Sequence, residues 1–258
     1  MRRLAEREPI TSSRKAMVAI ALTFVAGFVD AVGYLSLRHI LNANMSGNTI
    51  AIGYNTIQGH PDVALERGFA VLMFVVGLFI AAFIHEFGHR HDVRSVSVIP
   101  FALEIGLLLA YISLGQPVLR GEEVVPLHES TIYWLLALST LAMGIQNATL
   151  TRAEALSVRT THVTGTISKF AEATSRYLFW FYDRLRAGRS LRFTLRASRL
   201  QRDFIDSQLT ALLWIAFLAG GFAGAYLKYR IELFALLAPV AVLIVVIAVD
   251  MMRPFRQE

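Results

Sequence analysis

Long apolar runs, with the charged residues gathered between them, constrain this chain most. A helix needs about 20 apolar residues to cross a bilayer. Six runs approach or reach that length, at 16–37, 68–87, 96–114, 131–150, 209–227 and 231–251. Hydrophobic residues make up 55% of the 258 residues, above the roughly 45–50% that is usual for soluble domains. The sequence therefore predicts an all-α, polytopic membrane protein with six transmembrane helices.

The basic residues predict the orientation of these helices. Cytoplasmic loops carry an excess of Lys and Arg. With the N-terminus inside, 20 of the 25 Lys and Arg residues fall in the inside segments 1–15, 88–95, 151–208 and 252–258. We therefore expect both termini to be cytoplasmic, with residues 1–15 as a leader.

Two further stretches, 44–57 and 160–173, are too apolar for exposed loops and too short to cross a membrane. Each centres on a small hydroxylated motif, Ser46-Gly47-Asn48-Thr49 in the first and Thr164-Gly165-Thr166 in the second. Ser and Thr cap helices, and Gly allows a tight turn before one. We therefore expect each stretch to start a short half-helix that dips into the membrane.

The two motifs indicate an internal repeat. Gly27 lies 20 residues before Gly47, and Gly144 lies 21 residues before Gly165; when Gly27 is aligned with Gly144, Asp30 in GFVDA falls opposite Asn147 in GIQNA. Residues 16–127 and 128–258 then form two three-helix units. Because each unit crosses the membrane an odd number of times, the second is inverted relative to the first. Transporters are often built from such inverted repeats, with broken helices and a substrate site near the midplane.

These same motifs resemble a known family. The run GFVDAVGYL followed by MSGNTIAIG, and the later run MGIQNATLTRAEALSVRTTHVTGT, are similar to the two signatures of the YoaK-like family. That family comprises uncharacterised bacterial membrane proteins with a domain of unknown function. The resemblance covers about residues 16–250, and it implies about six helices and a location in the bacterial inner membrane. It implies no reaction and no substrate.

Asp30 is the most informative single residue, because it lies near the middle of the first span. A charge at that depth costs about 2.5–3.5 kcal/mol on insertion scales. One hypothesis is that Asp30 carries a proton or cation coupled to transport. The alternative is a structural carboxyl bonded to Gln146 or Asn147. The predicted substrate- or ion-binding set is Asp30, Ser46, Gly47, Asn48, Thr49, Gln146, Asn147, Thr164, Gly165 and Thr166.

A rival motif is His85-Glu86-Phe87-Gly88-His89, which fits the H-E-x-x-H pattern of zinc proteases. An intramembrane metalloprotease with ligands His85 and His89 and base Glu86 is therefore an alternative. The motif lies where the second span meets a basic loop, which is a natural place for polar residues. The Asp-Gly ligand motif of such proteases is absent from the sequence.

The segment 170–206 combines aromatic residues with a series of arginines. This combination favours an interfacial segment on anionic lipid over nucleic-acid binding. Gly220, Gly221 and Gly224 form a stripe of small residues that predicts close helix packing. The packing can be within one chain or between two copies in a homo-oligomer.

The sequence holds no Walker loop, dinucleotide fingerprint or hydrolase elbow. We therefore expect a secondary transporter of a small solute, without a cofactor and not an enzyme. A metalloprotease and a non-transporting scaffold or sensor remain the alternatives.

Overall fold

The computed structural model describes residues 13–119, 129–153 and 163–252, and these form nine α-helices and one 3-10 helix. The helices are α1 (Ser13–Ser36), α2 (Met45–Ile57), α3 (Pro61–Arg90), α4 (Val98–Gly115), α5 (Glu129–Ala153), α6 (Val163–Arg186), α7 (Leu191–Ser198), α8 (Arg202–Ile231), η1 (Glu232–Leu236) and α9 (Leu237–Met252). Most of the predicted leader 1–15, and the predicted boundary between residues 127 and 128, lie outside the described residues.

Four helical segments of the described residues are long and apolar enough to cross a bilayer: Arg14–Ser36, Pro61–Arg90, Val98–Gly115 and Arg202–Met252. The last is 51 residues long, far more than one crossing needs. It contains both predicted spans 209–227 and 231–251. The prediction of an all-helical membrane protein is therefore confirmed, although the second span begins earlier than residue 68, at Pro61.

The predicted span 131–150 corresponds to α5, which is not among those four segments. Its sequence includes Ser139, Thr140, Gln146, Asn147 and Thr149, all of them buried. Helix α5 packs along α3 and α4. A helix enclosed by other helices can carry polar groups that a lipid-facing helix cannot, which explains its low hydropathy.

A sharp turn separates α8 from α9. Glu232 has a left-handed φ of 54°, which is uncommon for a residue with a side chain. The side chain of Gln116 holds this turn, because its Nε2 donates to Glu232 Oε2 and its Oε1 accepts from Leu233 N at 2.9 Å. The expected helix over 231–251 therefore starts as the 3-10 helix η1, and α9 is only 16 residues long.

The two predicted half-helices have different outcomes. Helix α2, at Met45–Ile57, closely matches the stretch 44–57. Helix α6 starts inside the stretch 160–173 but continues to Arg186 instead of ending near 173. It continues because α6 packs along α8, with the ring of Tyr177 against that of Phe204.

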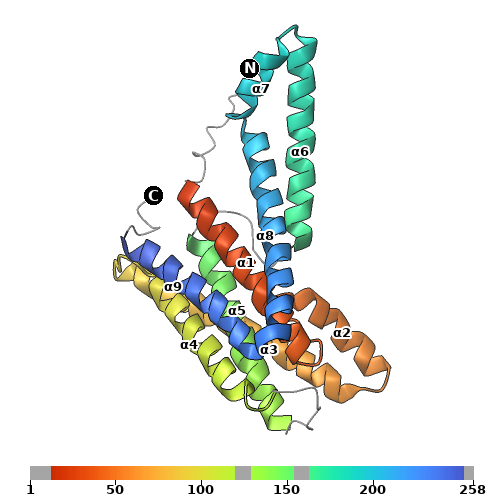
Figure 1. The fold of residues 1–258 in the computed structure, drawn as a ribbon, viewed down its shortest axis with the longest axis vertical. Helices are drawn as coiled ribbons and strands as arrows, with labels where there is room; N and C mark the ends of the chain where they lie inside the picture. The colour runs from red at the N-terminus through yellow and green to blue at the C-terminus, as the bar shows by residue number, and fades with distance from the viewer. Residues whose placement is uncertain (1–12, 120–128, 154–162, 253–258) are drawn as a thin grey trace.

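Helices α6 and α7 and the first half of α8 form an arm that projects from the helix bundle (Figure 1). The arm contains most of the segment 170–206. Arg176 Nε donates to Asp203 Oδ1 at 2.8 Å, and Tyr177 Oη donates to Ser198 Oγ at 3.0 Å. These contacts fold the segment into a helical hairpin.

Within the bundle, α1 packs along α8 at a crossing made of glycines. A Cβ on Gly27 would overlap the carbonyl oxygen of Phe217, and one on Gly220 would overlap the carbonyl oxygen of Phe24. The two backbones are therefore in direct contact. This finding confirms that the stripe of small residues on α8 packs within the chain.

Helices α3 and α5 cross in the same way. A Cβ on Gly144 would overlap the carbonyl oxygen of Phe74, and one on Gly77 would overlap the carbonyl oxygen of Leu141. Gly27 and Gly144 are the two glycines that the aligned motifs GFVDA and GIQNA have in common. Corresponding residues therefore make corresponding contacts.

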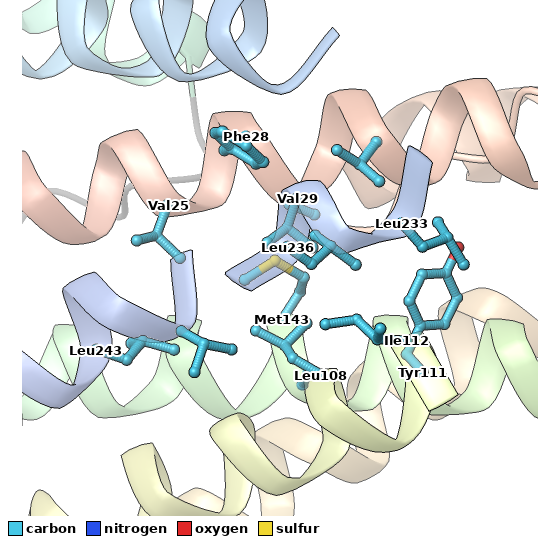
Figure 2. Packing of buried hydrophobic residues seen from close by; sticks show 14 of the residues in the cluster. Val25, Phe28, Val29, Leu108, Tyr111, Ile112, Met143, Leu233, Leu236 and Leu243 are labelled. Atoms are coloured by element: carbon cyan, nitrogen blue, oxygen red, sulfur yellow. The ribbon is translucent and has the colours of Figure 1, made fainter. Parts of the chain in front are cut away.

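The apolar core lies between α1, α4, α5, η1 and α9, as Figure 2 shows. Its labelled members are Val25, Phe28, Val29, Leu108, Tyr111, Ile112, Met143, Leu233, Leu236 and Leu243. In lipid, association of helices depends on close van der Waals packing rather than on exclusion of water. Complementary side chains here and bare glycine backbones at the crossings provide that packing.

Candidate functional site

A small cavity lies where the first turns of α2 and α6 approach each other. Its volume is about 130 Å³. The lining residues are Ala43, Asn44, Met45 and Ser46 from the start of α2, Phe74 from α3, and Val163 and Thr164 from the start of α6. The two motifs that the sequence singles out therefore meet at one cavity, although more than 100 residues separate them.

The chain reaches the start of α2 through a tight reversal after α1. Arg38 and His39 both adopt left-handed φ values, 44° and 58°. Asn44 occupies the N-cap position of α2, but its side chain makes no capping hydrogen bond. The first turn of α2 therefore has no side-chain cap, although Asn and Ser are residues that often provide one.

Asp30 holds this turn in place from α1. Its Oδ1 accepts hydrogen bonds from the backbone N–H groups of Asn42 at 2.6 Å and Ala43 at 2.8 Å. Its Oδ2 accepts from Nδ2 of Asn44. Asp30 is 4% exposed, and these donors compensate for the burial of its carboxyl. The hydrogen-bond partners of the Asp30 carboxyl therefore include residues 42–44. Gln146 has no hydrogen-bond partner among the described residues, so it does not bond Asp30.

Asn48 holds the same turn from within α2. Its Nδ2 donates to the carbonyl oxygen of Leu41 at 2.7 Å, and its Oδ1 accepts from Leu41 N at 3.3 Å. Its Oδ1 also accepts from the guanidinium of Arg67 at 3.2 Å. Asn48 is completely buried. It therefore builds the turn and does not line the cavity.

The other predicted site residues divide into three groups. Ser46 and Thr164 line the cavity. Gly47, Thr49 and Gly165 are exposed beside it on α2 and α6, and the Thr49 hydroxyl donates to the carbonyl oxygen of Met45. The buried group consists of Gln146, Asn147 and Thr166, and none of these is a lining residue.

Sequence reasoning missed two buried charged residues at the start of α3. Glu66 and Arg67 are 5% and 9% exposed, and Glu66 Oε1 accepts from Arg38 at 2.6 Å. They were expected outside the span because the apolar run begins at residue 68. The signal that could have found them is their helical spacing from Ala70 and Phe74, which are buried on the same helix.

The HEFGH motif occupies the last two turns of α3. Glu86 pairs with Arg90 at 2.9 Å, and both side chains are more than half exposed. His89 is also exposed. Among the described residues, no group of three or more His, Asp or Glu side chains is arranged to hold a metal ion. The geometry of this motif therefore does not favour a zinc site.

Comparison with known proteins places the chain in a family. Residues 18–249 match the family described as "Protein of unknown function (DUF1275)". The UPF0700 transmembrane protein YoaK of Bacillus subtilis (strain 168) is 28% identical over 159 residues, which cover 62% of this chain and 67% of that protein. The UPF0700 transmembrane protein RA0705 of Rhizobium meliloti (strain 1021) is 29% identical over 179 residues, which cover 66% and 68%. No solved structure matches.

These matches confirm the resemblance that the two motifs indicate. The family match includes every predicted site residue from Asp30 to Thr166. Both relatives are named transmembrane proteins, in agreement with the long apolar helices described above. The chain is a membrane protein, is similar to YoaK and belongs to the DUF1275 family.

Proposed function

We propose that this protein is a secondary transporter of a small polar solute, and that the cavity between the first turns of α2 and α6 is its solute site. The observation that carries the proposal is this cavity, because it joins two motifs from the two halves of the sequence. Irregular backbone at membrane depth is tolerated only where it is buried in protein or lines a wet cavity.

The proposal includes six spans, α1, α3, α4, α5, α8 and α9, arranged as two inverted three-helix units. Equivalent glycine crossings support the repeat, because α1 meets α8 as α5 meets α3. The same correspondence extends to the half-helices, since α2 packs on α3 and α6 packs on α8. In a repeat of three spans, one half-helix enters from each side of the membrane.

The basic arm supports a cytoplasmic position for both termini. Its described residues from 184 to 202 include seven arginines, and several large apolar side chains of α6 and α7 are exposed. This combination suits the anionic lipid headgroups of the cytoplasmic leaflet. The bacterial inner membrane is the proposed location.

The size and lining of the cavity support a solute of only a few non-hydrogen atoms. A volume of about 130 Å³ is below the range of about 300–1,000 Å³ that is typical for drug-sized ligands. Ser46 and Thr164 supply hydroxyl groups, and Phe74 supplies an apolar wall. The N-terminal ends of α2 and α6 add partial positive charge, which favours a polar or anionic solute.

Transport rather than catalysis is proposed because of what the lining lacks. None of the described lining residues has a side chain that serves as a general acid or base. Hydroxyl and amide groups bind and orient a solute without changing it.

Solute uptake by the purified full chain in proteoliposomes tests the proposal. Stopped-flow light scattering follows osmotic swelling with formate, acetate, nitrate, urea and glycerol as probes. We expect at least one probe to enter faster than into protein-free liposomes. We also expect Thr164→Phe and Ser46→Phe to reduce that rate at least tenfold, because a phenyl ring fills the cavity.

Ser168→Phe is the matched control. Ser168 is exposed one turn after Thr164 on α6 and does not line the cavity, so this variant should keep the wild-type rate. Equal rates for Thr164→Phe and Ser168→Phe would contradict the assignment of the site. Wild-type rates no faster than those of empty liposomes, for all five probes, would count against transport.

A further inference from the structure

A second acidic residue lies in the bundle, and its surroundings are the reverse of those of Asp30. Glu104 on α4 has 0% exposure, and neither of its carboxyl oxygens has a hydrogen-bond partner among the described residues. Asp30, in contrast, accepts from two backbone N–H groups and one amide. The two acids therefore require different explanations.

An ionised carboxylate needs donors or a cation when it is removed from water. Asp30 has such donors and can remain ionised. Glu104 lies in an 18-residue helix that is long and apolar enough to cross a membrane, and neither of its carboxyl oxygens has a hydrogen-bond partner among the described residues. Because an unpaired charge is strongly disfavoured there, the neutral, protonated acid is the form that fits this conformation.

No charged group described on the helices packed on α4 bonds to Glu104 to offset this burial. Helix α4 packs on α5, η1 and α9, and touches α3. Among the described residues of α5, η1, α9 and the end of α3 nearest α4, the titratable groups that are not exposed are Tyr133, Glu232, Asp250 and His85, whereas Glu86, His89 and Arg90 at that end of α3 are exposed.

Each of these four groups lies at an end of α4 or faces elsewhere. The backbone of Asp250 accepts from Ser95, before α4 begins, and Glu232 contacts Gln116, just after it ends. The ring of Tyr133 packs against Phe69 of α3.

His85 belongs to the same end of the bundle as the start of α4. It precedes Gly88 by one turn, and Gly88 contacts Val96, just before α4. None of the four groups is therefore placed to pair with Glu104.

The neighbouring helix does supply a neutral polar group. Gln146 on α5 is completely buried, and both atoms of its amide lack a partner among the described residues. Leu108 and Met143 belong to the same packed cluster (Figure 2). Glu104 is one turn from Leu108 on α4, and Gln146 is about one turn from Met143 on α5. Two buried polar side chains without a hydrogen-bond partner among the described residues thus lie on adjacent, packed helices, whereas most buried polar groups in proteins are hydrogen-bonded.

We propose that Glu104, and not Asp30, is a proton-binding site of this protein, and that Gln146 is the amide that hydrogen-bonds the carboxylate when the proton leaves. In this step the carboxyl O–H bond breaks and the proton passes to a water molecule that enters as α4 and α5 separate. The step deepens the proposed transport function and rests on it for coupling. Proton occupancy itself does not depend on solute movement.

Infrared spectroscopy of the full chain in lipid tests the proposal. A protonated carboxyl has a C=O stretch that is well separated from the bands of a carboxylate. We expect the wild-type spectrum at neutral pH to contain this stretch and the Glu104→Gln spectrum to lack it. The matched variant Asp30→Asn should instead lose carboxylate bands and keep the stretch. Loss of carboxylate bands in Glu104→Gln would overturn the proposal.

A wild-type sample with ¹³C-carboxyl glutamate gives a second reading that needs no substitution. The stretch should shift to lower wavenumber, and an unshifted band would exclude glutamate as its source.

If one of the five probes enters proteoliposomes, we expect an imposed pH gradient to change its rate at least threefold in wild type and not in Glu104→Gln. Uptake that responds equally in both proteins would overturn the coupling role, whereas absence of uptake with the infrared band present would count against transport alone.

Discussion

At the scale of single residues, the structure separates buried polar groups that build the fold from those that have no structural partner. Asp30 and Asn48 each bind the backbone of the turn before α2, one from α1 and one from within α2. Together they hold Asn44 and Ser46 at the cavity. A carboxyl in a transmembrane helix is therefore not by itself evidence of ion coupling, because its hydrogen bonds decide its role.

The substitution Asp30→Ala should destabilise the protein strongly. It leaves two backbone N–H groups and the Asn44 amide without an acceptor, and each buried unsatisfied donor costs about 1–3 kcal/mol. Asp30→Asn should cost less, because its carbonyl oxygen can still accept from Asn42 and Ala43. Thermal unfolding in detergent measures both effects.

Thr56→Ala is the control for this comparison. Its hydroxyl is exposed and bonds only within α2, to the carbonyl oxygen of Ile52, so its unfolding temperature should stay near that of wild type. If Asp30→Ala unfolded no earlier than Asp30→Asn, the role of the carboxyl in anchoring the turn would be wrong.

At the scale of helices, two crossings of bare backbone hold the bundle together. Gly27 and Gly220 let α1 and α8 touch, and Gly77 and Gly144 do the same for α3 and α5. Lipid tails offer helices an environment as apolar as their partners, so contact area and fit determine which helices associate. A side chain at either crossing would force the helices apart.

We therefore expect Gly27→Ala and Gly144→Ala to destabilise the protein by similar amounts, about 1–3 kcal/mol, which is typical of overpacking. Gly106→Ala is the matched control, because nothing lies within 4 Å of a Cβ at that position on α4. There the better helix propensity of Ala should leave stability equal or higher by up to about 1 kcal/mol. Unfolding in mixed micelles measures all three, and a neutral Gly144→Ala would contradict close contact between α3 and α5.

At the scale of the whole molecule, the proposed inverted repeat requires the loop between α2 and α3 to lie on one side of the membrane. The loop between α3 and α4, and the arm, must lie on the other side. The chain contains no cysteine, so single introduced cysteines report accessibility without background. Gln58, Arg94 and Arg189 are exposed positions in these three regions.

Gln58→Cys should react with a membrane-impermeant maleimide on intact spheroplasts. Arg94→Cys and Arg189→Cys should react only after the membrane is opened, because positively charged loops stay in the cytoplasm. A fully denatured sample of each variant gives the maximal labelling for comparison. Labelling of Gln58→Cys and Arg94→Cys from the same side would exclude a crossing by α3.

Local signals in the sequence determined the helical class and the start of α2. Run length in an apolar sequence sets how many helices can cross a bilayer, and the Ser-Gly-Asn-Thr motif marks where α2 begins. The alignment of Gly27 with Gly144 was also visible in the sequence. Each of these features depends on residues that are close together in the chain, so the sequence pattern alone predicts them.

Only the tertiary structure decided which polar groups find partners. The donors to Asp30 come from a turn whose path depends on α1 and α2 together, and Arg67 is buried because α3 begins before its apolar run. Glu104 and Gln146 lack partners because of how α4 and α5 pack. Hydrogen bonding and burial between distant segments depend on three-dimensional arrangement, which residue type and spacing along one chain do not specify.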